Sequence, residues 1–243
     1  MKLENKAAIV TGGSRGIGKA TAVALGMEGC RVAICGKDKK NLSAAEVELK
    51  NSGIDVYPFL CDVSKPAEIK KFASSVVRKF GQIDIVVNNA GVAYYKDFKK
   101  SSEEEINQTI DVNIRGLILL TKYLLPKINK NGIIINISSG AGKHGFGGLS
   151  VYCASKFAVI GFTESLAQEL KGIRTVSICP GGVDTEMYMS MSGFHPGLKP
   201  EHIAAKIIEV CTEPRKFKSG SAIEVYKVSD ALNYLKMKYF RKK

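Results

Sequence analysis

The chain has 243 residues, of which 45% are hydrophobic and 24% are charged, and its formal net charge is +13. A chain of this length and composition ordinarily forms one folded domain with a sizeable core, so we expect a single domain over residues 1–243. No apolar run approaches the roughly 20 residues of a membrane span, and the charged N-terminus lacks the apolar stretch of a signal peptide. We therefore expect no transmembrane segment and a cytoplasmic location.

The basic excess is spread over many small groups of lysine and arginine. The ordinary interpretation is a solvated, lysine-rich surface. The alternative is a basic face for a phosphorylated cofactor or an acidic substrate, including carrier-linked acyl groups. No RNA- or DNA-binding motif accompanies the charge, so we expect no nucleic-acid partner. The six cysteines lack CxxC spacing and companion histidines, which indicates structural thiols and no metal site.

Strand and helix signals alternate along the whole chain. Strands are predicted at residues 7–11, 31–35, 54–60, 83–88, 132–138, 173–179 and 221–227. Helices are predicted at about 16–29, 39–51, 66–80, 103–128, 151–170 and 200–212. This alternation predicts an α/β fold, a doubly wound domain whose seven-stranded, mainly parallel sheet is flanked by helices on both faces. Ligands of such sheets bind beyond the carboxyl ends of the strands.

A glycine-rich turn follows the first predicted strand. Residues 11–18 read TGGSRGIG, with glycines at positions 12, 16 and 18. A turn without bulky side chains lets backbone N–H groups and the following helix N-terminus face a pyrophosphate. Because a strand precedes this segment and a helix follows it, the segment predicts a nucleotide-binding turn.

A tyrosine and a lysine lie four residues apart in the helix predicted at 151–170. Tyr152 and Lys156 therefore project from the same helix face. An unperturbed tyrosine, with a pKa of about 10, is a poor base near neutral pH. A neighbouring ammonium lowers that pKa and makes proton exchange practical. The YxxxK pattern also occurs by chance on amphipathic helices, and the glycine-rich turn favours the catalytic interpretation.

Together these residues resemble the short-chain dehydrogenase/reductase family, and the resemblance covers nearly the whole chain. The markers occur in the family's order: residues 11–18, Asp62 with Val63, residues 88–91 (NNAG), Asn113, Ser139, Tyr152, Lys156, residues 180–183 (PGGV) and Thr185. The resemblance implies a Rossmann-type domain that moves hydride between the nicotinamide C4 and the carbinol or carbonyl carbon of a substrate. It implies a catalytic tetrad of Asn113, Ser139, Tyr152 and Lys156.

The resemblance also implies a role for each of the four. Tyr152 is the general acid in reduction and the base in oxidation, while Lys156 lowers its pKa and holds the nicotinamide ribose. Ser139 hydrogen-bonds the substrate oxygen, and Asn113 anchors a water-linked proton path to Lys156. Preplaced donors are needed because the oxygen gains charge as hydride arrives.

The cofactor contacts implied by the resemblance come from several strand ends. Asp62 accepts from the adenine amine, and Asn89 either lines the adenosine ribose or has a structural role. The nicotinamide carboxamide meets Val183 and Thr185. The expected cofactor-binding residues are Gly12, Ser14, Arg15, Gly16, Ile17, Gly18, Gly36, Lys37, Asp62, Val63, Asn89, Ala90, Gly91, Tyr152, Lys156, Pro180, Gly181, Val183 and Thr185.

Cofactor choice depends on the end of the second strand. An acidic residue there would pair with a free ribose 2′-hydroxyl and repel a 2′-phosphate. Position 36 is glycine, Lys37 follows it, and Arg15 lies in the phosphate turn. We therefore predict NADP(H) as the cofactor. A shift in register that placed Asp38 on the ribose would favour NAD(H), which stays as the alternative.

Two segments are expected to wall the substrate pocket, residues 142–148 and 186–196. The second carries apolar side chains that predict an adaptable lid, with a helix packed on the protein body as the alternative. They are Met187, Tyr188, Met189, Met191 and Phe194. An amphipathic closing helix is indicated at residues 231–240, where the family usually has a glycine pair.

The predicted function is an NADP(H)-dependent carbonyl reductase or alcohol dehydrogenase acting on a small-molecule ketone, aldehyde or alcohol. A 3-oxoacyl carrier-protein reductase, an NAD-dependent alcohol dehydrogenase and a catalytically idle NADP-binding sensor or scaffold are the alternatives. Family members associate through the helices that correspond to 103–128 and 151–170. We therefore expect a homodimer or homotetramer.

Overall fold

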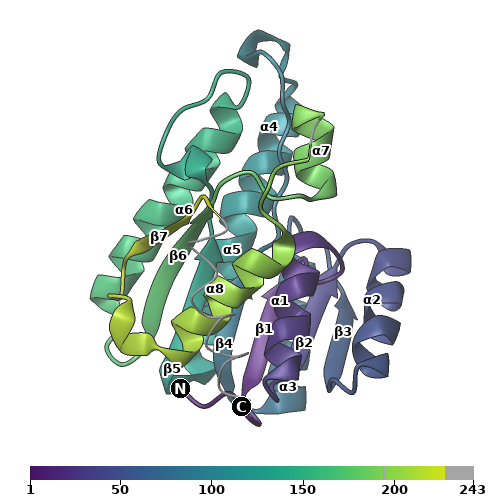
Figure 1. The fold of residues 1–243 in the computed structure, drawn as a ribbon, viewed down its shortest axis with the longest axis vertical. Coiled ribbons are helices and arrows are strands. Elements are labelled where there is room, and N and C mark those ends of the chain that lie inside the picture. Colours follow the sequence, from purple (N-terminus) through teal and green to yellow (C-terminus); the bar gives the residue numbers. More distant parts are fainter. Residues whose placement is uncertain (194, 228–243) are drawn as a thin grey trace.

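The computed structural model describes residues 1–193 and 195–227. Phe194 and the closing helix expected at 231–240 lie outside the described residues. Seven strands form one sheet in the order β3-β2-β1-β4-β5-β6-β7 (Figure 1). They are β1 (Ala7–Thr11), β2 (Arg31–Gly36), β3 (Val56–Leu60), β4 (Ile83–Asn88), β5 (Ile128–Ile137), β6 (Arg174–Pro180) and β7 (Ala222–Val225).

All pairings between neighbouring strands of this sheet are parallel. The chain runs outward from β1 to β3, returns to β4 beside β1, and then runs outward to β7. This order confirms the predicted doubly wound, Rossmann-type α/β fold. The order reverses between β1 and β4, and a crevice at such a switch point is where ligands of open α/β sheets bind.

Helices cover both faces of the sheet (Figure 1). One face carries α1 (Gly16–Met27), α2 (Lys39–Asn51) and α8 (Pro200–Thr212), whose apolar side chains pack on Ala8 and Val10 of β1. The other carries α3 (Pro66–Phe80), α5 (Leu117–Leu124) and α6 (Ser150–Glu169), which pack on Ala7 and Ile9. Burial on both faces explains why β1 shows no alternation of apolar and polar residues.

The helical stretch expected at about 103–128 is found over residues 103–127, but its hydrogen-bonding pattern changes along the way. The segment contains α4 (Glu103–Ile110), a π-helical turn (Asp111–Gly116), α5 and a 3₁₀ turn (Leu125–Lys127), and β5 begins at Ile128 rather than residue 132. Pro126 cannot continue the hydrogen bonding of an α-helix. At the end of the π-helical turn Gly116 lies against the backbone of Val63, whose oxygen would be 2.3 Å from a Cβ at that position. The other predicted strands and helices begin and end within two residues of the observed ones.

Within the described residues, no helix is long and apolar enough to cross a membrane. No group of His, Cys, Asp and Glu side chains in that part of the chain is placed to hold a metal ion. All six cysteines are buried and free.

Candidate active site

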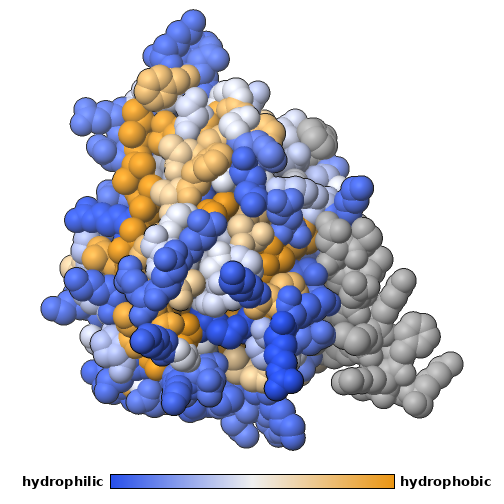
Figure 2. All heavy atoms as spheres, turned by 90° about the vertical axis from the view of Figure 1, so that its left-hand side faces the viewer, coloured by the Kyte–Doolittle hydropathy of each residue, from blue (hydrophilic) through white to orange (hydrophobic). Residues whose placement is uncertain are grey.

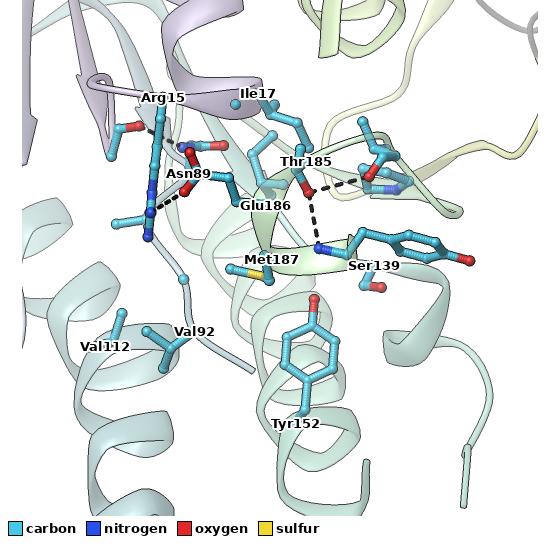
Figure 3. Close-up of a pocket in the computed structure, with 18 of the residues that line it drawn as sticks. Arg15, Ile17, Asn89, Val92, Val112, Ser139, Tyr152, Thr185, Glu186 and Met187 are labelled. Atoms are coloured by element: carbon cyan, nitrogen blue, oxygen red, sulfur yellow. Dashed lines mark hydrogen bonds and ion pairs between the residues drawn. The ribbon is translucent and has the colours of Figure 1, made fainter. Parts of the chain in front are cut away.

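A cavity of about 1170 Å³ extends along the carboxyl edge of the sheet. The turns that follow β1 to β6 supply its walls, as the fold requires. Every expected site residue lines this cavity except Gly18 and Asn113. Figure 3 shows Arg15 and Asn89 on one side of it, with Ser139 and Tyr152 below the segment that carries Thr185 and Met187.

The glycine-rich turn connects β1 to α1 by a close backbone crossing. Gly12 has a left-handed φ of +64°, which favours glycine. Gly18 lies in α1 directly under this turn, and a Cβ there would be 2.1 Å from the Gly12 oxygen. Gly18 therefore lets helix and turn pack together, while Gly12 and Gly16 face the cavity. The helix N-terminus presents its backbone N–H groups at this edge, which suits a pyrophosphate.

Asn89 joins the end of β4 to the glycine-rich turn. Its Nδ2 donates to the Thr11 carbonyl at 2.8 Å, and its backbone N–H donates to Thr11 Oγ1 at 2.9 Å. Ala90 N donates to the same hydroxyl at 3.0 Å. These bonds favour the structural role for the Asn89 amide, which holds two strand ends together at the switch point.

Tyr152 and Lys156 lie on successive turns of α6, at the edge of the cavity. Lys156 is 4% exposed, and its Nζ donates to the Ile137 carbonyl at 2.9 Å. The same ammonium lies 5.6 Å from the centre of the Tyr152 ring. Burial lowers the pKa of Lys156 to about 8. The prediction that Tyr152 and Lys156 project from the same side of one helix is therefore confirmed.

The predicted lowering of the Tyr152 pKa is not found. Burial raises the pKa of Tyr152 to about 12, and the hydrogen bond with the Ser139 side chain only partly offsets this. The physical reason is that Lys156 lies over the face of the ring and donates to Ile137, rather than to the phenol oxygen. The phenol is thus a protonated group, poised to donate.

Asn113 lies behind the cavity wall, in the π-helical turn. Its Oδ1 accepts from Val92 N at 2.8 Å, and its Nδ2 donates to Val92 O at 2.9 Å and to Ser155 Oγ at 3.0 Å. Ser155 Oγ in turn donates to the Tyr152 carbonyl at 2.7 Å. The amide side chain is thus occupied in holding the wall and the Tyr152 turn. Sequence analysis missed Ser155, although its place directly before Lys156 was visible.

The end of β2 has the features that the cofactor prediction relied on. Gly36 is the last residue of the strand, and a Cβ there would be 2.9 Å from Ser14 Oγ. Lys37 follows, exposed and lining the cavity. Asp38 accepts from Asn41 N at 2.7 Å and thereby caps the N-terminus of α2. One oxygen of its carboxylate is therefore used by the helix, and Asp38 also lines the cavity.

A short helix, α7 (Glu186–Ser192), covers part of the cavity. Thr185 caps it by accepting from Tyr188 N at 3.2 Å. Met187, Tyr188 and Met191 line the cavity, whereas Met189 does not. None of the residues Glu186–Ser192 is buried, so this segment is a helical cover rather than a helix packed into the core.

The remaining walls of the substrate end come from loops. Of the segment 142–148 only Phe146 lines the cavity, and it is joined by Leu149 and by Tyr95 from the loop after β4. Sequence analysis did not single out Tyr95 or Leu149. Tyr95 packs against Gly148, whose Cβ would be 2.8 Å from the ring. The adjacent pair Tyr94-Tyr95 after the NNAG segment was the one available signal.

The chain matches a family model described as short chain dehydrogenase over residues 6–194. It is 33% identical over 240 residues to the 3-oxoacyl-[acyl-carrier-protein] reductase of Thermotoga maritima, covering 93% of this chain and 98% of that protein. It is 34% identical to 17-beta-hydroxysteroid dehydrogenase 13 of Rattus norvegicus, covering 83% of this chain and 70% of that protein.

Solved structures resemble the whole fold. A short chain dehydrogenase from Burkholderia cenocepacia in complex with NADP has a TM-score of 0.86 and 29% identity, covering 93% of this chain and 98% of that one. A 3-ketoacyl-(acyl-carrier-protein) reductase from Brucella melitensis complexed with NADH has a TM-score of 0.86 and 28% identity, covering 92% and 98%. Both nicotinamide cofactors thus occur among proteins of this similarity.

Proposed function

The chain belongs to the short-chain dehydrogenase family, and on that basis we propose that this oxidoreductase uses NADP(H) to interconvert a carbonyl group and an alcohol. The observation that carries the proposal is one cavity that joins the glycine-rich turn to the Ser139–Tyr152–Lys156 group. The bound nicotinamide would supply or accept the hydride. The tetrad roles expected from the sequence are part of this proposal, with Asn113 acting as a positioning residue.

The adenosine end of the cavity supports a cofactor with a 2′-phosphate. Gly36 offers no carboxylate at the end of β2, and one oxygen of the next acidic residue, Asp38, accepts from the N-terminus of α2. Arg15 and Lys37 both line the cavity there. A phosphate dianion gains from two nearby cations, whereas a ribose hydroxyl gains little from them. NAD(H) is the second candidate.

The protein's own groups supply the proton chemistry. With its pKa raised to about 12, the Tyr152 phenol is protonated at neutral pH and can donate to the carbonyl oxygen of a substrate. Ser139, which lines the cavity beside it, would hydrogen-bond the same oxygen. The Lys156 ammonium adds positive charge as the oxygen becomes negative. This arrangement supplies the proton that reduction of a carbonyl needs at neutral pH.

The substrate end of the cavity supports a moderately apolar ketone or aldehyde. Its walls are Tyr95, Phe146, Leu149, Met187 and Met191, and thioether side chains adapt to ligands of different shape. A 3-oxoacyl thioester is the second candidate, because the Thermotoga maritima reductase named for such a substrate covers nearly the whole chain.

We also propose that the enzyme is cytoplasmic and forms at least a homodimer through α6. Six free thiols suit a reducing compartment. Hydrophobic side chains form a band over the face that includes α6 (Figure 2). On that helix Ala154, Phe157 and Gly161 are exposed at spacings of three and four residues, which places them on one face.

Turnover of NADPH and NADH with a panel of ketones, aldehydes and 3-oxoacyl thioesters tests the proposed function. We expect NADPH-dependent reduction that falls by about 10³-fold or more in Tyr152→Phe, because the proton donor is lost. Tyr123→Phe, outside the cavity lining, is the matched control and should keep the activity. Turnover with NADH alone would contradict the proposed cofactor. Tight NADPH binding without turnover of any carbonyl would support the sensor or scaffold instead.

A further inference from the structure

An ion pair joins the two sides of the cofactor crevice. The Arg15 guanidinium, in the glycine-rich turn, lies 2.5 Å from a Glu186 carboxylate oxygen at the first residue of α7. Figure 3 shows this contact next to Asn89, with α7 lying across the cavity beyond it. Both residues line the cavity. Arg15, which is expected to bind the 2′-phosphate of the cofactor, is therefore already paired with the Glu186 carboxylate.

The helix that Glu186 begins is held to the rest of the site by several contacts. None of the residues Glu186–Ser192 is fully buried, and the Tyr188 ring lies against Gly182, where a Cβ would be 2.8 Å from it. Its N-terminus is fixed by the Thr185 cap and by the closeness of Thr185 to Gly16, where a Cβ would be 3.3 Å from the threonine methyl. Beyond α7, His195 pairs with Asp184 at 2.7 Å. The Arg15 contact is therefore one of several that hold the start of α7 beside the phosphate turn.

We propose that Glu186 sets the strength of NADP(H) binding by competing with the cofactor's 2′-phosphate for Arg15. This inference rests on the proposed NADP(H) function. A guanidinium that moves to the phosphate must give up its ion pair with Glu186, and the loss of that pair opposes binding of the phosphate. A cofactor without the 2′-phosphate makes no such demand on Arg15. Glu186 is thus a specificity-determining residue, because it weakens binding of the phosphorylated cofactor and not of the other.

The competition has a second consequence for α7. Linkage requires that if Glu186 opposes phosphate binding, phosphate binding loosens the Glu186 contact by the same factor. The 2′-phosphate would thus release the start of the helix that covers the cavity. The side chains of Arg15 and Glu186 are 60% and 74% exposed. Exposed ion pairs contribute little, so the competition should amount to about a two- to fivefold change in dissociation constant.

Dissociation constants for NADPH and NADH, measured by titration of intrinsic or cofactor fluorescence, test the competition. Glu186→Gln removes the charge and keeps the shape of the side chain. We expect it to bind NADPH about two- to fivefold more tightly while the NADH constant changes less than twofold. Glu186→Asp keeps the charge and should retain most of the wild-type ratio. Glu48→Gln breaks the comparable Lys19 pair on α1, outside the cavity lining, and should leave both constants unchanged.

Hydrogen exchange of the backbone amides in 186–192 tests the release of α7 without the nicotinamide half of the cofactor. Saturating 2′,5′-ADP should speed exchange there in the wild type, whereas 5′-AMP should not, and Glu186→Gln should remove the difference. If the wild type prefers NADPH and Glu186→Gln leaves the ratio of the NADPH and NADH dissociation constants unchanged, only the inference about Glu186 is overturned. Tighter wild-type binding of NADH than of NADPH would overturn the proposed cofactor itself.

Discussion

Burial moves the pKa values of Tyr152 and Lys156 in opposite directions, to about 12 and about 8. Between these values the phenol is still protonated while the amine loses its charge. We expect carbonyl reduction to be constant from about pH 6 to 7.5 and to fall through about pH 8, because the cation beside the developing alkoxide is lost. Initial rates of reduction against pH test this. A rate that is level up to about pH 10 would show that the Lys156 charge is not needed.

The lowered pKa of Lys156 also predicts that its buried charge decreases the free energy of unfolding. In the unfolded chain a lysine keeps its proton up to about pH 10.4, so between about pH 8 and 10.4 the unfolded state binds more protons and stability rises with pH. At neutral pH the buried charge therefore costs up to about 3 kcal/mol. Lys156→Met should raise the free energy of unfolding at pH 7, and the gain should shrink as pH rises. Urea unfolding at several pH values measures it; a gain independent of pH would contradict the explanation.

Gly36 offers a direct test of cofactor choice at the residue scale. An aspartate there would lie where a 2′-phosphate is expected, and the repulsion of about 1–2 kcal/mol should weaken NADPH binding by about tenfold or more. Gly36→Asn is the matched control, since it makes the same close approach to Ser14 Oγ without charge. If both variants weaken NADPH equally, crowding of the phosphate turn rather than charge decides the outcome.

At the scale of the elements, the π-helical turn links the catalytic wall to the adenine side. Gly116 ends this turn against Val63, which lines the cavity. Because a Cβ would lie 2.3 Å from the Val63 oxygen, Gly116→Ala should cost about 1–3 kcal/mol and weaken cofactor binding. Gly147→Ala adds the same methyl where no atom lies within 4 Å and should be nearly neutral. Chemical denaturation of both variants measures the free energy of unfolding. An equal loss in Gly116→Ala and Gly147→Ala would contradict this explanation.

Sequence patterns predicted elements well where the pattern is local. A continuous apolar run marked β1, and the glycine spacing marked the turn before α1. The π-helical turn was not predicted, and its residues make distant contacts that no local pattern shows, Asn113 with Val92 and Gly116 with Val63. For the segment of α7 a lid and a packed helix stayed as alternatives, because the same apolar side chains suit a cavity wall and a helix on the protein body.

The candidate site shows the same division. Motif residues after the strands meet in one cavity because parallel strands bring their carboxyl ends to one edge. The rim residues Tyr95 and Leu149 come from loops, whose paths depend on packing such as that of Tyr95 on Gly148. The ion pair of Arg15 with Glu186 joins residues 171 positions apart in sequence, and no local pattern indicates it.

At the scale of the whole molecule, the proposed homodimer would form through the exposed side of α6. Phe157 is 47% exposed on this helix, and the small residues Ala154 and Gly161 flank it on the same face. A large ring between small residues suits close packing of two helices. Because about half of the ring is already covered in one copy, burying the rest contributes about 1 kcal/mol for each copy. The hydrophobic band of Figure 2 would continue this contact over neighbouring elements.

Phe157→Glu should therefore yield a monomer, because two carboxylates would face each other in an apolar contact. Light scattering should give the mass of one chain for the variant and of two or four chains for the wild type. The melting temperature of the wild type should rise with protein concentration, and that of the variant should not. Met27→Glu, which charges an exposed methionine at the end of α1, should leave the assembly intact. If Phe157→Glu keeps the mass of a wild-type oligomer, the copies associate through another face. In that case α6 makes no contact between copies.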